Sequence, residues 1–226
     1  MTTKLDGPVD ETARTHRVNG TPAAFDKDVF TPGESREFGG RHGDVTVTSA
    51  ATAPSAAGRK WLAVARIAIG GVFLWPFLDK LFGLGYSTKA SGAWLQGGSP
   101  TKGFLSHVDV GPGASFFQSI AGTWWADWLF MLGLGGVGVA VILGVGLRIS
   151  AIAGSVLMMM MWLAEWPLAR FTNGGDPTGS TNPILDYHLL YALVLVAVAV
   201  TAAGTVWGFG KKWASLPLVQ RNPWLK

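Results

Sequence analysis

Four carboxylates stand at the ends of four apolar stretches in this chain of 226 residues. In chain order they are Asp79, Asp127, Glu165 and Asp186. They close the first stretch, open the second, close the third and open the fourth. If the stretches cross a membrane in succession, this order gathers all four carboxylates on one face. Because ionisable groups near a bilayer are costly and tend to mark function, the pattern predicts a site for proton transfer or ion pairing there.

Two of these carboxylates need a partner. Asp79 and Glu165 stand at predicted helix C-termini, where the helix dipole disfavours an anion. Lys80 and Arg170 follow them in the sequence and are candidate counter-ions, or groups that attract an anionic substrate. An ion-paired lid over the helices explains the same four residues equally well.

The other two carboxylates, Asp127 and Asp186, stand in predicted first turns, where the dipole favours an anion by about 0.3–1 kcal/mol. A capping role explains both, and substrate binding is the alternative. His188 follows Asp186 by two residues, so on a helix their side chains do not face each other. Because histidine titrates near neutral pH, His188 is a candidate proton carrier or hydrogen-bond partner of a quinone carbonyl, with a structural histidine as the other interpretation.

Tryptophans crowd the same ends of the stretches. The seven are Trp75, Trp94, Trp124, Trp125, Trp128, Trp162 and Trp166. Tryptophan is generally enriched where a membrane meets water, which explains most of them. Trp75 and Trp162 are the candidates for stacking on a flat ring such as a quinone.

The composition favours a membrane protein and excludes several kinds of site. Charged residues make up 14% of the chain, against roughly 25% in soluble domains. The basic excess lies at the flanks of the apolar stretches and shows no nucleic-acid-binding pattern. The absence of cysteine excludes thiolate metal sites, cysteine-bound iron–sulfur clusters and thiol nucleophiles. We also expect no haem and no metal, because only one histidine lies near a span and no metal-ligand spacing appears.

Four helices of about 20 residues, the length that crosses a bilayer, must position these side chains. They are predicted at about 61–84, 125–147, 149–167 and 183–207. A long loop, 86–124, contains a predicted short helix at 114–121. Arg66 is expected to snorkel back to the near membrane face. Asn182 is the expected N-cap of the last helix, with Pro183 at its first position.

The predicted fold class is an all-α membrane protein, a four-transmembrane-helix bundle with a long outer loop and a disordered N-terminal tail. Residues 1–60 have the composition of a disordered tail, in which 25–38 is a candidate docking segment for a partner. Residues 61–210 form the bundle and 211–226 a basic tail. Lys and Arg number seven on one side of the helices and four on the other, which predicts cytoplasmic termini and an outward-facing long loop.

Three strings of the sequence carry a family resemblance. They are RIAIGGVFLWPFLDKLFG (66–83), AWLQGGSPTKGFL (93–105) and NPILDYHLLYALVL (182–195). They resemble the DoxX/DoxD-like family of four-helix membrane proteins over about residues 61–210, with Arg66 and the Asp79–Lys80–Leu81 ending of the first helix as the best markers. Some members are named as the membrane subunit of thiosulfate:quinone oxidoreductase. The resemblance therefore implies a membrane redox protein that uses thiosulfate or a related sulfur anion.

We accordingly expect a subunit in a bacterial plasma membrane that couples sulfur-anion oxidation to reduction of a non-covalently bound quinone at the outer face. Asp79, Glu165 and His188 are the expected proton carriers. The expected substrate-binding residues are Lys80, Arg170, Trp75, Trp162, Asp127 and Asp186. The expected partners are the lipid bilayer and a redox subunit or respiratory complex, and not nucleic acid. A non-catalytic assembly subunit of a larger redox complex is the alternative, and small-solute transport is a third interpretation.

Overall fold

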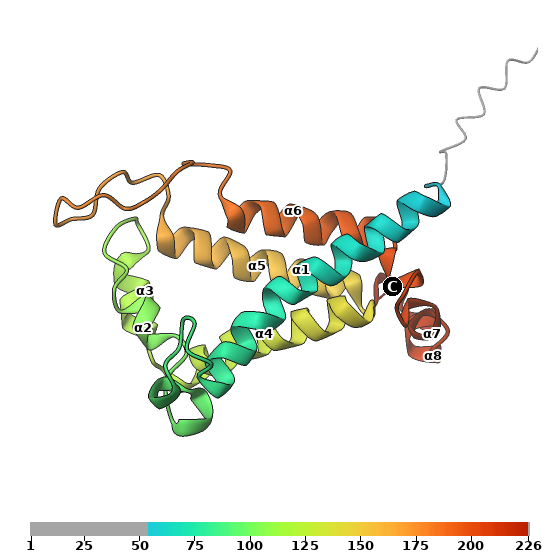
Figure 1. Cartoon of the computed structure of the whole chain (residues 1–226), viewed down its shortest axis with the longest axis horizontal. Helices are drawn as coiled ribbons and strands as arrows, with labels where there is room; N and C mark the ends of the chain where they lie inside the picture. Colours follow the sequence, from blue (N-terminus) through green and yellow to red (C-terminus); the bar gives the residue numbers. More distant parts are fainter. Residues whose placement is uncertain (1–53, 226) are drawn as a thin grey trace, which may run out of the picture. The chain divides into compact units, whose positions relative to one another are not determined.

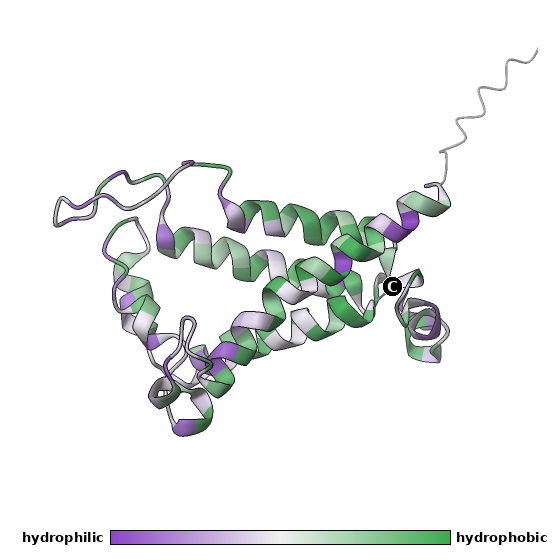
Figure 2. Cartoon of the chain, viewed as in Figure 1, coloured by the Kyte–Doolittle hydropathy of each residue, from purple (hydrophilic) through white to green (hydrophobic). Residues whose placement is uncertain are grey.

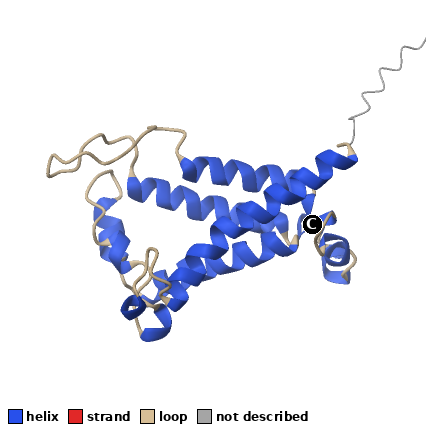
Figure 3. Ribbon diagram, viewed as in Figure 1, coloured by secondary structure: helices blue, strands red, loops and turns tan. Residues whose placement is uncertain are grey.

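The computed structural model describes residues 54–225, and the regular elements in that range are helical (Figure 3). Four long helices dominate it (Figure 1). They are α1 (Ala56–Phe82), α4 (Trp124–Leu143), α5 (Leu147–Glu165) and α6 (Tyr187–Val200). The predicted docking segment 25–38 and most of the predicted tail lie outside the described residues. The first helix begins at Ala56, five residues before the predicted start of the first span.

Short helices fill the connections. Between α1 and α4 the chain forms η1 (Ala90–Gly92), η2 (Trp94–Gln96), α2 (Lys102–Leu105) and α3 (Ala114–Ile120). The predicted helix at 114–121 is thereby confirmed. After α6 the chain forms η3 (Ala203–Thr205), α7 (Gly210–Ala214), α8 (Pro217–Arg221) and η4 (Pro223–Leu225). The segment predicted as a basic tail therefore contains helical turns.

Three helices, α1, α4 and α5, are long and apolar enough to cross a membrane. Figure 2 shows that apolar residues dominate the long helices, while polar residues gather at their ends and in the loops. The fourth apolar helix, α6, has 14 residues, which at 1.5 Å per residue is shorter than the roughly 30 Å of hydrocarbon core. A membrane protein with three spanning helices is thus supported, and the fourth span remains a prediction.

The start of α6 differs from its prediction. Asn182 does not cap the helix, because its Oδ1 accepts hydrogen bonds from the loop amides of Ile184 and Leu185, at 3.0 and 2.9 Å. Asp186 is the N-cap, and its carboxylate accepts a hydrogen bond from the amide of Leu189 at 3.2 Å. The predicted capping role of Asp186 is confirmed. The Asn182 side chain forms a local turn instead, a common alternative to helix capping for this residue type.

Glycines set the crossing of α1 and α4. A Cβ placed on Gly138 would lie 2.7 Å from the backbone nitrogen of Leu74, and one on Gly70 would lie 2.6 Å from the side chain of Ile142. The two backbones can approach this closely only because both residues lack a side chain. Beside this crossing, Phe73, Val137, Val141, Met158 and Leu195 form the core shared by the four long helices.

The prediction that Arg66 snorkels to the membrane face is wrong. Its side chain is completely buried. Nη1 donates to the carbonyl oxygens of Val141, at 2.7 Å, and Ile142. Nη2 donates to those of Trp207, at 2.8 Å, and Val206, at 3.3 Å. Carbonyls in the last turn of a helix lack partners within it and form the negative end of its dipole, so the C-terminus of α4 suits a cation. Both Nη atoms are hydrogen-bonded, to this end and to residues 206–207, whereas the buried Nε has no partner among the described residues.

Replacing Arg66 by Met should strongly destabilise the fold. The substitution removes the side-chain donor of four carbonyls, and unsatisfied buried groups cost about 1–3 kcal/mol each. The Val141 carbonyl keeps a second bond, from the Gly144 amide at 3.1 Å. We expect a loss of about 3 kcal/mol or more, measured as a lower thermal unfolding temperature in mild detergent. Lys60→Met, at an exposed position of the same helix, is the matched control and should shift stability by about 0.5 kcal/mol or less. Equal unfolding temperatures for the two variants would contradict this role of Arg66.

Candidate functional site

A cavity of about 830 Å³ lies where α1 and α5 end and α4 begins. Its wall is mainly apolar, with Phe104, Phe117, Trp125, Phe130, Leu157 and Met161 among the lining residues. The charged side chains in the lining are Lys80, Lys89 and Glu165. The volume falls within the range of about 300–1,000 Å³ that is typical of small-molecule sites, and so does the combination of an apolar wall with a few polar groups.

Glu165 connects this cavity to a hydrogen-bonded group at the start of α6. Its Oε1 accepts a hydrogen bond from the phenol of Tyr187 at 2.7 Å, and its Oε2 lies 3.9 Å from Nδ1 of His188. The same Nδ1 lies 2.8 Å from Oδ2 of Asp186. His188 is 1% exposed, whereas Glu165 is about one-third exposed. A carboxylate at the cavity wall therefore accepts a hydrogen bond from a phenol and lies near a buried imidazole.

The contact between His188 and Asp186 overturns the expectation that their side chains diverge. That expectation assumed helical geometry for both residues. Asp186 is instead the N-cap, with an extended backbone (φ −83°, ψ 179°), which lets its carboxylate reach both the amide of Leu189 and the imidazole. The two-residue spacing rule applies only inside a helix.

The group has the composition of a metal site. Ligand atoms of Glu165, Asp186 and His188 all lie within 4.8 Å of one another. Carboxylates with an imidazole suit Zn²⁺, Mn²⁺ or Fe²⁺. However, the imidazole nitrogen that faces the two carboxylates is already hydrogen-bonded to Asp186. The group thus consists of two hydrogen-bonded pairs, Glu165 with Tyr187 and Asp186 with His188, which lie next to each other.

A smaller cavity of about 280 Å³ shares part of its wall with the first. Glu165, Ala164, Gly103 and Phe104 line both cavities. The other residues that line the smaller cavity include His107, Asp109, Thr172 and Thr178. A larger share of its lining side chains is therefore polar than in the large cavity. Glu165 therefore stands between a largely apolar cavity and one with several polar groups.

Asp79 holds the chain where it turns back after α1. Its buried carboxylate accepts hydrogen bonds from the backbone amides of Tyr86 and Ser87, at 3.2 and 2.9 Å, and from the Ser87 hydroxyl at 2.7 Å. The predicted pairing with Lys80 is not formed. Consecutive side chains of a helix diverge, and Lys80 lines the cavity, with its Nζ 6.0 Å from the centre of the Phe130 ring. Asp79 is not among the cavity-lining residues.

Asp127 fixes another part of the same loop. Its Oδ1 accepts hydrogen bonds from the Thr101 amide and hydroxyl, at 3.0 and 2.6 Å, and from the Ser99 hydroxyl at 2.9 Å. Asp127 lies in the first turn of α4, as predicted, but Thr123 is the N-cap and the Asp127 carboxylate bonds to the loop. Because Ser99 and Thr101 line the large cavity, Asp127 stabilises one of its walls.

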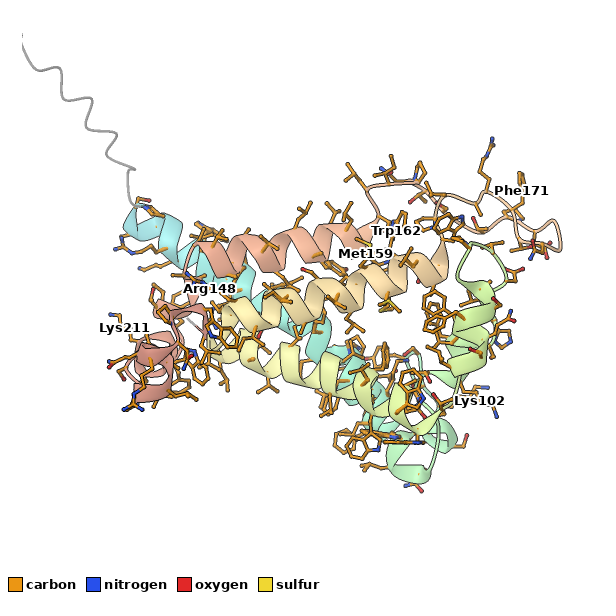
Figure 4. All side chains as sticks on the ribbon, turned by 180° about the vertical axis from the view of Figure 1, so that it is seen from behind. Lys102, Arg148, Met159, Trp162, Phe171 and Lys211 are labelled. Atoms are coloured by element: carbon orange, nitrogen blue, oxygen red, sulfur yellow. The ribbon has the colours of Figure 1, made fainter. Side chains whose placement is uncertain are left out.

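The remaining predicted site residues lie outside the lining of the large cavity. Arg170 is exposed beside the Phe171 ring and forms no ion pair with a carboxylate of residues 54–225, so its predicted pairing is wrong. Trp75 is 47% exposed and packs edge-on against Tyr86, with 5.1 Å between ring centroids. Trp162 packs edge-on against Trp166, at 5.7 Å. In Figure 4, Trp162 and Lys102 lie at the cavity end, and Arg148 and Lys211 lie at the opposite end.

Sequence reasoning missed most of the residues that form the cavity. The sequence did contain a signal for Met161, because its spacing of four residues places it on the same helix face as Glu165. The structure places Met161 in the cavity wall. Met158, which shares that face by spacing, lies in the core. Tyr187 stands between Asp186 and His188 in the sequence, and this short polar run at the start of an apolar helix was the available signal. The signal for the aromatic wall was the predicted helix at 114–121, which has Phe116, Phe117 and Ile120 on one side, and all three residues line the cavity.

The chain was compared with protein-family models, with curated proteins and with solved structures, and none of the three comparisons finds a match. The DoxX/DoxD-like resemblance therefore stays a prediction, and the function is argued from the site.

Replacing Asp127 by Ala should loosen the cavity wall. The substitution leaves the Thr101 amide and two hydroxyls without their shared acceptor, so local opening around residues 99–101 should become easier. We expect faster amide hydrogen exchange there by about tenfold or more, since about 1.4 kcal/mol corresponds to one factor of ten. Asp176→Ala, at an exposed loop position, is the control and should leave this exchange unchanged. Unchanged exchange in Asp127→Ala would show that its hydrogen bonds do not hold the loop.

Proposed function

We propose that this protein is the membrane subunit of an oxidoreductase system and binds a quinone in the large cavity beside Glu165. One observation carries the proposal. A cavity of about 830 Å³ with aromatic and methionine walls is lined by a carboxylate that contacts a phenol and lies near a buried imidazole. This combination suits an apolar ring whose reduction consumes protons.

The lining matches the chemistry of a quinone. A quinone has a flat apolar ring, two carbonyl oxygens and, in membranes, an apolar tail. Aromatic side chains such as Phe117 and Phe130 favour offset or edge-on packing with a ring, and Met161 adapts to its outline. Lys80 and Lys89 supply cationic donors for a carbonyl oxygen, which gains negative charge as electrons arrive.

Proton supply is the second requirement. Reduction of a quinone to a quinol takes up two electrons and two protons. Glu165 is the proposed proton donor at the cavity wall, Tyr187 is the proposed group that orients it, and His188 is the proposed group that reprotonates it. The smaller cavity, which also contacts Glu165, is the proposed route by which protons reach this carboxylate from water. Glu165 and His188 thus remain the proposed proton carriers. Asp79 is no longer one, because its carboxylate is hydrogen-bonded to the loop after α1.

The electrons are proposed to come from an anionic sulfur donor such as thiosulfate, directly or through a partner subunit. The family resemblance names this donor class, and exposed cations at the cavity end offer an electrostatic attraction to anions. These cations are Lys89, Lys102 and Arg170. We place this end at the outer face of a bacterial plasma membrane on the Lys/Arg distribution. We also propose that α6 with its flanking residues is the fourth crossing.

Quinone binding can be tested by filling the cavity. Met161→Trp adds bulk at a lining position, so it should weaken binding of a benzoquinone with a decyl tail by about fivefold or more, as about 1–3 kcal/mol of overpacking implies. Titration of the purified protein in detergent measures this affinity. Met159→Trp is the matched control, because Met159 lies on the same helix, is 46% exposed and does not line the cavity (Figure 4). Equal affinities for the two variants would place the quinone elsewhere.

Catalysis can be tested separately at Glu165. Glu165→Gln keeps the shape of the side chain and removes its proton transfer, so thiosulfate-dependent quinone reduction should fall by about 10²-fold or more with little change in quinone affinity. Asp176→Asn, an exposed carboxylate outside both cavities, should keep its activity. A wild-type protein that binds quinone but supports no turnover would favour the alternative of a non-catalytic subunit in a larger redox complex.

A further inference from the structure

At the end of the bundle opposite the cavity, the charged side chains of residues 54–225 are all positive. Those in the described part of the chain are Arg59, Lys60, Arg148, Lys211, Lys212 and Arg221, and all six are exposed. The carboxylates between residues 54 and 225 belong to the cavity end and its loops. They are Asp79, Asp109, Asp127, Glu165, Asp176 and Asp186. No acidic side chain of the described residues therefore neutralises these cations locally.

One backbone hydrogen bond and one from a side chain gather four of these cations, Arg148, Lys211, Lys212 and Arg221, into one surface. The amide of Phe209, just before α7, donates to the carbonyl of Leu143 at the end of α4, at 2.8 Å. Nη1 of Arg148, at the start of α5, donates to the carbonyl of Pro223 in η4, at 3.0 Å. These bonds hold α7, α8 and η4 against the turn between α4 and α5, and Figure 4 shows Arg148 and Lys211 at this same end.

Large apolar side chains are exposed among the cations. Trp207, Phe209, Leu216, Leu218 and Trp224 are between 45% and 65% exposed. The opposite side of the same segment is anchored, because Val219 and Leu225 are buried and the Trp213 indole donates to the carbonyl of Leu225 at 2.7 Å. Cations interleaved with exposed tryptophan and leucine are typical of segments that lie in the head-group region of a membrane.

We propose that this basic face, formed by Arg148, α7, α8 and η4, binds anionic phospholipid head groups of the adjacent leaflet. The helices α1, α4 and α5, which are long and apolar enough to cross a membrane, each have one end here, and a bilayer around them would bring the cations to head-group level. Phosphate oxygens accept hydrogen bonds from guanidinium and ammonium groups, while the exposed aromatic rings insert beside the acyl chains. An acidic protein partner would not require these apolar side chains.

Lipid retention by the full chain tests the proposal. The protein is placed in nanodiscs of equal parts phosphatidylglycerol and phosphatidylcholine, extracted in mild detergent, and analysed by native mass spectrometry for bound lipid. We expect wild-type protein to retain phosphatidylglycerol over phosphatidylcholine. The combined substitution Lys211→Gln, Lys212→Gln and Arg221→Gln should reduce that preference by about tenfold or more, because each cation near an anionic surface contributes roughly a fivefold effect.

A matched control removes three exposed cations from the other end, as Lys89→Gln, Lys102→Gln and Arg170→Gln. This variant should keep most of the preference for phosphatidylglycerol. Added salt should lower the wild-type preference, which checks the electrostatic origin without any substitution. Thermal unfolding in phosphatidylcholine alone confirms that both triple variants are folded.

Three outcomes would overturn the proposal. An unchanged lipid preference after loss of Lys211, Lys212 and Arg221 would show that the basic face does not select the lipid. An equal loss in the control variant would show a non-specific charge effect. The chain's own N-terminal segment, with eight Asp and Glu within residues 1–53, is the other acidic candidate for this face. A several-fold rise in phosphatidylglycerol retention on its deletion would show that this segment occupies the face in the full chain.

Discussion

The buried guanidinium of Arg66 is the interaction on which the rest of the structure depends. It joins the first helix to the carbonyl end of α4 and to the chain that leaves α6. Burying a charge of this kind is costly unless it is hydrogen-bonded, and the C-terminus of a helix supplies both free carbonyls and a negative dipole end for the two Nη atoms. Glycines complete the junction, because a Cβ on Gly204 would lie 2.3 Å from the carbonyl oxygen of Gly144.

With this end of the bundle fixed, carboxylates organise the other. Asp79 and Asp127 accept hydrogen bonds from the loop that follows α1 and hold it in place as a wall of the cavity. Glu165 and Asp186 instead belong to the group that surrounds His188. Four residues that looked equivalent in sequence thus divide into two that hold the loop around the cavity and two that lie close to His188. The proposed redox function depends on the second pair, and the cavity depends on the first.

Sequence reasoning located the long helices and the short helix of the outer loop because apolar length and composition are local properties. It failed wherever a side chain is satisfied by a distant partner. Arg66 bonds to carbonyls 75 or more residues away, and Asp127 bonds to a loop 26 to 28 residues earlier. It also failed at Asp186, where the extended N-cap backbone turns the carboxylate toward His188. The aromatic cavity wall depends on how the loop folds back onto α4 and α5, which periodicity does not report.

The central claim is that a quinone occupies the cavity beside Glu165. A structure determined in lipid with a bound benzoquinone tests it most directly. The account predicts a flat density inside the cavity, against Phe117, Phe130 and Met161, with a ring oxygen within hydrogen-bonding reach of Glu165 or Lys80. Flat density against Trp75 at the outer surface, or a cavity closed by its own side chains while quinone is bound elsewhere, would contradict it.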